Sequence, residues 1–322
     1  MNVAIITGVS GQDGAYLAQL LVVKGYKVIG LSRGYNNNKF ERLDYLEIRD
    51  KIVIEECDLL DLSGVINVFK KYLPAEIYNL SAQSSVGISF DQPIGTIQYN
   101  ITSVLNILEA IRILDLPAKF YQASSSEMFG KVRDLPITLN TPMHPVSPYA
   151  ISKATAYWTC INYRESYQMF ICNGILFNHE SYLRSPNFFI KKVISESIKI
   201  KQGFSTHLKV GNIDIKRDFG FAPKYVEAMW LSLQREIPYD YIICSGTSVS
   251  LRSVIEHIFE VLNIDKTKIV EDSTFYRPNE IDDSYGSNQA ARELLGWHYD
   301  VSFYEVLDIL IKEELTNNKS NK

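Results

Sequence analysis

The sequence predicts an α/β protein built on a doubly wound parallel sheet, followed by a smaller C-terminal part that binds substrate. Short apolar runs alternate with longer amphipathic segments through the first half of the chain. Strands joined by helices in this way form parallel sheets that are covered on both faces. A glycine-rich turn separates the first apolar run from the helical pattern after it. The 322 residues supply chain for about two domains.

The periodicity locates each element. Strands are expected in the first half at residues 3–6, 27–31, 52–55, 76–80 and 119–123. Helices are expected there at residues 13–24 and 99–114. The second half predicts helices at residues 187–202, 225–233 and 249–262, and a strand at 241–245 that could return to the main sheet.

Composition excludes several classes of protein. With 33 basic and 37 acidic side chains, the chain has no overall positive field for nucleic acid or an anionic membrane. Its apolar runs are too short to span a bilayer, and the N-terminus lacks the basic start of a signal peptide. Four scattered cysteines without a C-x-x-C pair argue against a metal site and for a reducing compartment. A soluble, cytoplasmic protein is therefore expected.

The first strand is followed by glycines at positions 8, 11 and 14, and a helix begins within this loop. Glycines at such spacing permit a tight turn and close helix packing, and the helix N-terminus attracts a pyrophosphate. Gln12 and Asp13 lie inside the same loop. The pattern predicts a nicotinamide dinucleotide site.

The second strand ends in Arg33, where a carboxylate would favour NAD and an arginine suits the 2′-phosphate of NADP. A solvated surface arginine is the alternative. We expect NADP, with Asp58 and Leu59 near the adenine.

A helix start carries a candidate catalytic pair. Ser147 can cap this helix and Pro148 suits its first position, so Tyr149 and Lys153 stand one turn apart on one face. A nearby lysine cation favours the phenolate that a tyrosine needs to act as a base. Ser125 and Glu127 follow the fifth expected strand, at the end of the sheet where ligands bind. Glu127 is a candidate general acid/base, or alternatively a carboxylate that caps a backbone N–H.

These motifs resemble those of extended short-chain dehydrogenase/reductases with a Rossmann domain, and more narrowly the GDP-mannose 4,6-dehydratase family. The resemblance extends over nearly the whole chain and includes the runs GQDGAYL at 11–17, NLSAQS at 79–84, GILFNHES at 174–181 and FYRPNE at 275–280. It implies an NADP-binding domain over residues 1–172, completed by segments around 210–245, and a nucleotide-sugar-binding part over 173–322.

The resemblance also implies roles for individual residues. Ser125, Glu127, Tyr149 and Lys153 match the catalytic positions, and His179 and Arg184 match positions near the cofactor. The remaining matches are substrate-binding positions, at Ser84, Asn178, Lys192, Arg217, Arg277 and Glu280. Without the family, Arg217 and Arg277 are candidate diphosphate clamps and His179 reads as a structural histidine.

The implied reaction is an internal oxidation, elimination of water and reduction on GDP-mannose. Three departures from the family pattern concern the sugar and the cofactor: Ser125 replaces a threonine, Tyr182 to Ser185 replaces a Pro-x-Arg-Gly run, and Arg33 lacks a second arginine beside it. A GDP-manno-heptose therefore remains an alternative substrate, and a 4-reductase or epimerase of the same fold remains an alternative activity. A non-catalytic dinucleotide sensor is a third reading. The resemblance and the apolar segments at 99–114 and 149–167 imply a homodimer or homotetramer.

Overall fold

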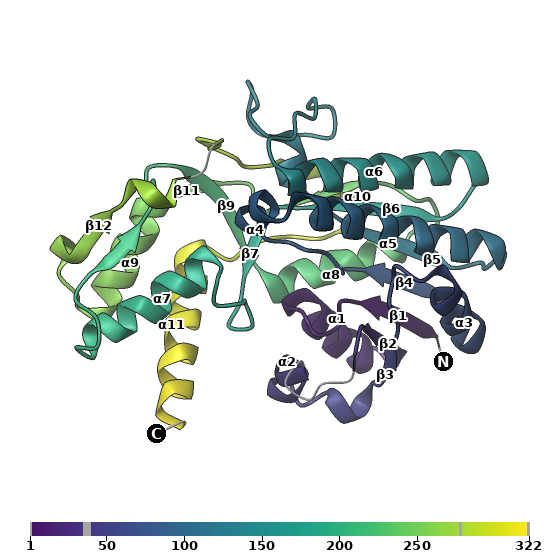
Figure 1. Ribbon diagram of the computed structural model, residues 1–322, viewed down its shortest axis with the longest axis horizontal. Coiled ribbons are helices and arrows are strands. Elements are labelled where there is room, and N and C mark those ends of the chain that lie inside the picture. The colour runs from purple at the N-terminus through teal and green to yellow at the C-terminus, as the bar shows by residue number, and fades with distance from the viewer. Residues whose placement is uncertain (1, 35–39, 277–278, 321–322) are drawn as a thin grey trace.

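The computed structural model describes residues 2–34, 40–276 and 279–320, and it shows a seven-stranded parallel sheet in the order β10-β6-β5-β4-β1-β2-β3 (Figure 1). The predicted doubly wound fold is confirmed. The strands are β1 (Val3–Thr7), β2 (Lys27–Ser32), β3 (Val53–Glu56), β4 (Glu76–Asn79), β5 (Lys119–Ser125), β6 (Ile171–Leu176) and β10 (Tyr241–Ile243). The sequence reading located all of these except β6, with ends shifted by one or two residues.

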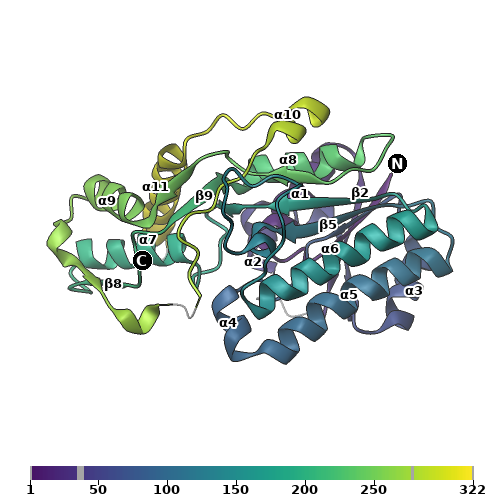
Figure 2. The same ribbon diagram turned by 90° about the horizontal axis from the view of Figure 1, so that it is seen from above.

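Helices cover both faces of the sheet. One face carries α3 (Leu62–Tyr72), α5 (Pro93–Ile113) and α6 (Pro148–Tyr167), and the other carries α1 (Gln12–Val23), α8 (Ala222–Leu233) and α10 (Gln289–Leu295). Figure 2 shows α5 and α6 side by side on the outside of the molecule. Alternation along β1 explains the two layers, because Ile5 packs under α5 whereas Ala4 and Ile6 pack against α1 and α8.

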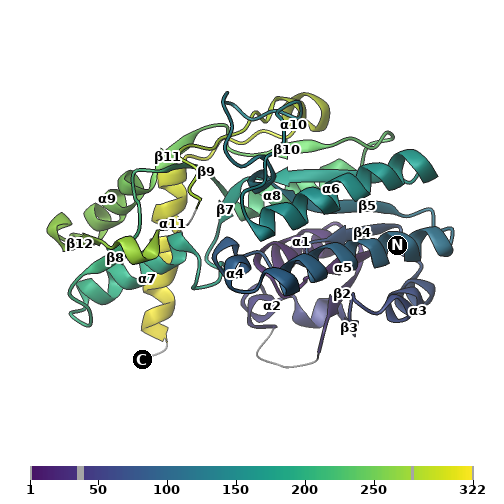
Figure 3. The ribbon, with the colours of Figure 1, turned by 45° about the horizontal axis from the view of Figure 1, so that its top comes forward.

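The C-terminal part has a core of its own. It is formed by α7 (Phe189–Lys201), α9 (Leu251–Leu262) and α11 (Phe303–Ser320), with β8 (Leu208–Val210) paired to β12 (Ile269–Glu271). The predicted helices at 187–202 and 249–262 correspond to α7 and α9. Figure 3 shows this lobe beside the carboxyl end of the main sheet.

A small three-stranded sheet connects the two lobes. It consists of β7 (Asn178–Glu180), β9 (Lys216–Phe221) and β11 (Ser248–Ser250), and β9 is its central strand. Because β7 follows β6 after a single residue, the main sheet leads directly into the connecting sheet. Shorter helices complete the fold at α2 (Glu41–Tyr45) and α4 (Val86–Asp91). No helix in the described ranges is long and apolar enough to cross a bilayer.

Candidate active site

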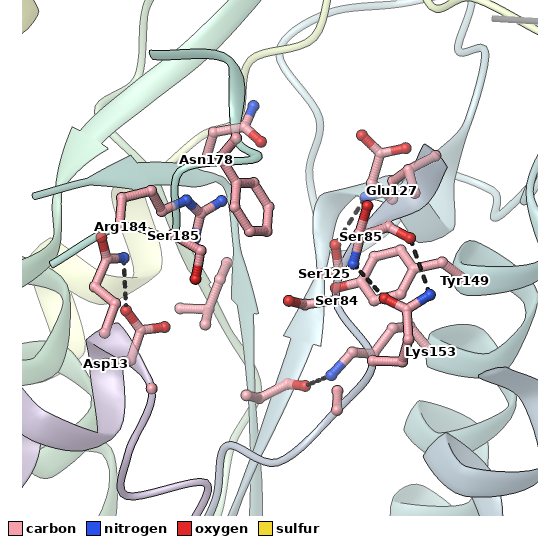
Figure 4. Close-up of a pocket in the computed structure, with 18 of the residues that line it drawn as sticks. Asp13, Ser84, Ser85, Ser125, Glu127, Tyr149, Lys153, Asn178, Arg184 and Ser185 are labelled. Carbon is pink, nitrogen blue, oxygen red and sulfur yellow. Dashed lines mark hydrogen bonds between the residues drawn. The ribbon is translucent and has the colours of Figure 1, made fainter. Parts of the chain in front are cut away.

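A cavity of about 900 Å³ opens at the carboxyl ends of β1, β4 and β5 and extends to the C-terminal lobe (Figure 4). It brings together side chains from segments far apart in the sequence. The predicted site residues that line it are Gly8, Gly11, Gln12, Asp13, Gly14, Arg33, Leu59, Ser84, Ser125, Glu127, Tyr149, Lys153, Asn178, His179, Arg184, Arg217 and Glu280.

Two predicted residues, Asp58 and Lys192, are placed outside this lining. Asp58 is exposed, its carboxylate accepts the backbone N–H of Leu60 at 3.0 Å, and it is not among the lining residues. Lys192 is also outside the lining, with its ammonium 4.7 Å from the centroid of the Phe275 ring, which does line the cavity. Arg277 lies outside the described residues.

The glycine loop has the close packing that its spacing predicts. Gly8 has φ +71°, and a Cβ there would approach the Ser81 backbone nitrogen to 3.0 Å. A Cβ on Gly14 would meet the Gly8 carbonyl oxygen at 2.3 Å. Gly11 precedes α1 without a capping side chain, so the first N–H groups of this helix remain directed at the cavity. The loop can therefore cradle a phosphate group.

Arg33 lies at the cavity wall at the end of β2. Its guanidinium is 4.8 Å from the centroid of the Tyr99 ring, and the Tyr99 hydroxyl is 2.7 Å from the Ser81 hydroxyl. This contact holds a cation beside the glycine loop, where an anionic group of a dinucleotide can be bound.

Ser125 and Glu127 come from the junction of β5 with a short 3-10 turn. The Ser125 hydroxyl accepts the backbone N–H of Glu127 at 3.3 Å, which caps this turn and fixes the start of the Glu127 side chain. Figure 4 shows both residues on the same side of the cavity as Tyr149. A carboxylate, a hydroxyl and a phenol therefore face one space.

Tyr149 and Lys153 lie on α6, which begins as predicted, with Ser147 accepting the backbone N–H of Ala150 at 3.1 Å and Pro148 in the first turn. Burial raises the pKa of Tyr149 to about 12, although a hydrogen bond with Ser125 lowers it. Burial also lowers the pKa of Lys153 to about 8.

Lys153 was expected to interact with Tyr149, but its ammonium is hydrogen-bonded to a backbone carbonyl. The Lys153 ammonium donates to the carbonyl oxygen of Ala123 at 2.8 Å, and it lies 5.9 Å from the centroid of the Tyr149 ring. The one-turn spacing placed both groups on one face, but the helix backbone does not decide which acceptor a long side chain reaches.

The opposite wall contains a network of charges. The Nδ1 of His179 donates to the Phe177 carbonyl oxygen at 2.7 Å, and its Nε2 lies 2.8 Å from the Asp13 carboxylate. Burial would raise the pKa of Asp13, but His179 lowers it to about 2. Arg184 adds a cation, 3.5 Å from the Glu180 carboxylate.

The substrate-side residues are held by the connecting sheet. The Asn178 amide donates to the Asp218 carbonyl oxygen at 3.4 Å, and Arg217 donates to the Ile281 carbonyl oxygen at 2.6 Å. These bonds join β7, β9 and the segment that carries Glu280, so the cavity wall is continuous across the two lobes.

Sequence reasoning missed several lining residues. Ser81, Gln83 and Ser85 follow β4, and the rule that ligands bind at carboxyl strand ends could have selected them along with Ser84. Tyr99, Phe188 and Phe275 have no such signal, because aromatic side chains in helices and loops more often pack in cores. No cluster of three metal-binding side chains occurs in the ranges that the structure describes.

Comparison with solved structures supports the architecture. RMD from Pseudomonas aeruginosa in complex with NADPH superimposes with a TM-score of 0.82 at 24% identity, over 98% of this chain and 100% of that one. The dTDP-glucose 4,6-dehydratase DesIV from Streptomyces venezuelae, with NAD and TYD bound, has a TM-score of 0.88 at 18% identity and covers 98% of both chains. At these identities the likeness shows the fold.

Sequence comparisons are more specific. The family model for GDP-mannose 4,6 dehydratase matches residues 5–310. GDP-mannose 4,6 dehydratase 2 from Arabidopsis thaliana is 40% identical over 100% of this chain and 89% of its own length, and the human GDP-mannose 4,6 dehydratase is 38% identical over 99% and 93%. The match extends through both lobes and all the lining segments. The chain therefore belongs to the GDP-mannose 4,6-dehydratase family.

Proposed function

We propose that this protein is an NADP-dependent GDP-mannose 4,6-dehydratase, which converts GDP-mannose to GDP-4-keto-6-deoxymannose and water. The observation that carries the proposal is the meeting of Ser125, Glu127, Tyr149 and Lys153 in one cavity with the glycine loop. Relatives named for this activity align over the full chain, which supports the same substrate class.

The cavity fits a nicotinamide dinucleotide. Gly8 and Gly14 leave room that a Cβ would fill, and Ser124 presents a buried hydroxyl with no protein partner in the described part of the chain. Arg33 supports NADP over NAD because it offers a cation where a ribose 2′-phosphate would need one. When bound, the nicotinamide would accept a hydride from the sugar and later return it.

Each catalytic side chain then has a proton to move. Tyr149 would remove the proton of the C4 hydroxyl as the ketone forms, with Ser125 hydrogen-bonded beside it. The ketone acidifies the C5 proton, which Glu127 would abstract. Glu127 or Ser125 would protonate the departing C6 hydroxyl, so one water is lost. The proton that Tyr149 took up would then return to C5, and the sugar has no net change in oxidation state.

Lys153 would act on Tyr149 rather than on the sugar. The pKa of the phenol is raised to about 12 by burial, so a buried ammonium one turn away lowers the cost of forming the phenolate. Arg217, Glu280 and Asn178 line the far wall and would bind the nucleotide moiety, with cations opposite the diphosphate.

The test is incubation with a panel of GDP-sugars, including GDP-mannose and a GDP-manno-heptose, followed by mass spectrometry. Loss of 18 mass units from GDP-mannose without net consumption of NADPH supports the proposal. Stoichiometric NADPH oxidation would identify a reductase, and a product of unchanged mass would identify an epimerase.

Glu127→Gln separates dehydration from simple oxidation. The amide is nearly isosteric but cannot accept the C5 proton, so elimination should slow by about 10²–10⁴. Exchange of the C5 proton with solvent deuterium should fall in parallel. Normal formation of the 6-deoxy product by this variant would show that the Glu127 carboxylate takes no part in the elimination.

We also propose that the protein is a homodimer or homotetramer that pairs through α5 and α6. Apolar side chains on these two helices are exposed, with Ile94 79% and Trp158 58% accessible. A second copy of this chain packed there would remove them from water. Sedimentation of a single 36.7 kDa particle at micromolar concentration would contradict this.

A further inference from the structure

Three buried polar side chains lie near the carboxyl ends of three neighbouring strands, at the end of the sheet that faces the cavity. Thr7 ends β1, Asn79 ends β4 and Gln122 lies in β5, with Thr7 paired to Asn79 and Asn79 paired to Gln122 in register. Each is at most 1% exposed. We call these three residues the polar row. The proposed reaction assigns no role to them.

The hydrogen bonds of the polar row have a fixed direction. The Thr7 hydroxyl oxygen accepts the backbone N–H groups of Leu80 and Ser81, each at 3.1 Å. Its own O–H must therefore donate, and it does so to the Asn79 side-chain oxygen at 2.6 Å. The two backbone N–H groups therefore determine the orientation of the Asn79 side-chain amide, with its oxygen toward Thr7.

The orientation of the Asn79 amide in turn determines that of the Gln122 amide. The Asn79 side-chain nitrogen faces the Gln122 side-chain oxygen at 2.8 Å, so the Gln122 nitrogen is turned toward the carbonyl oxygen of Ala123 at 3.1 Å. Because every member is buried, a reversed amide would leave buried polar atoms without hydrogen-bond partners, which is unfavourable. The Gln122 side chain can therefore only donate a hydrogen bond to the Ala123 carbonyl oxygen.

The same carbonyl holds Lys153. Its oxygen has two lone pairs, one taken by Gln122 and the other by the Lys153 ammonium at 2.8 Å. The partly positive amide N–H lies beside the ammonium and competes for the same acceptor. This competition weakens the hold of Ala123 on Lys153.

We propose that the polar row is a positioning device for Lys153: it keeps a competing donor on the Ala123 carbonyl, so that the ammonium stays available to Tyr149. The catalytic part of this inference rests on the proposed function, whereas the positioning part concerns the protein alone. Thr7, Asn79 and Gln122 are positioning residues, since none of them needs to touch the substrate.

Thr7→Val and Gln122→Met test the proposal. Valine matches threonine in shape and removes the hydroxyl that directs the row, about 10 Å from Gln122 across two strand spacings. Gln122→Met removes the competing donor itself. In both variants Ala123 should bind Lys153 more strongly, which raises the pKa of Lys153 above about 8 and reduces kcat about threefold to tenfold. Thr7→Ser keeps the hydroxyl and should restore both values.

The pKa of Lys153 can be followed by NMR in the full chain with 13Cε-labelled lysine, and Lys153→Met assigns its signal. Asn173→Ala is the matched control, because Asn173 pairs with Gln122 in register and is fully buried but donates to Asp240. This control should lower stability without moving the pKa of Lys153.

An unchanged Lys153 pKa in folded Thr7→Val and Gln122→Met would overturn the proposal, as would an equal change in Asn173→Ala. If Thr7→Val does not fold, Gln122→Met decides the question alone. The NMR titration needs neither cofactor nor substrate, so a failure to turn over GDP-mannose would contradict the proposed function and leave this measurement valid.

Discussion

Replacing Lys153 by methionine should abolish turnover and yet stabilise the fold at neutral pH. Lys153 is 5% exposed, and burial lowers its pKa from 10.5 to about 8. This pKa difference means that burying the charged ammonium lowers the folding stability by roughly 3 kcal/mol. Losing the hydrogen bond to Ala123 offsets about 1–2 kcal/mol of the gain. We therefore expect Lys153→Met to be more stable by about 1–2 kcal/mol at pH 7.

The stability gained by Lys153→Met should depend on pH. The unfolded chain binds the lysine proton up to about pH 10.5, whereas the folded chain releases it near pH 8, so the cost of Lys153 is full below pH 8 and disappears as the pH rises to 10.5. Urea unfolding of both proteins at pH 7 and pH 9.5 measures the difference. A Lys153→Met variant that is less stable at pH 7, or an advantage that does not shrink by pH 9.5, would refute the reasoning.

Two further substitutions test other parts of the site. Tyr149→Phe should reduce turnover below a few per cent while NADP binding, measured by fluorescence titration, persists, because only the buried hydroxyl is removed; substantial residual activity would point to another base. Asp13→Asn should cost about 2 kcal/mol at pH 7, since His179 holds the pKa of this carboxyl near 2 and the charged form stabilises the fold above about pH 4. That difference should shrink as the pH falls toward 2, and a constant difference between pH 7 and pH 3 would contradict the stabilising role assigned to the Asp13 carboxylate.

Local motifs could be read correctly from the sequence because their geometry depends on neighbouring residues. The glycines at 8, 11 and 14 require only a strand, a turn and a helix in succession, and the start of α6 follows from Ser147 and Pro148. The alternation of apolar runs and amphipathic helices was sufficient for the class of fold. For the same reason, the one-turn spacing of Tyr149 and Lys153 placed both side chains on one face.

Only the tertiary structure decided which groups meet across the strands. Asp13 and His179 are 166 residues apart and form a hydrogen bond because β7 returns beside the glycine loop. The strand order places β4 between β1 and β5, and this crossover alone brings Thr7 into line with Gln122. Periodicity specifies which face of a strand is buried but leaves its neighbours open. The acceptor of Lys153, and with it the electrostatic setting of Tyr149, is therefore a property of the assembled sheet.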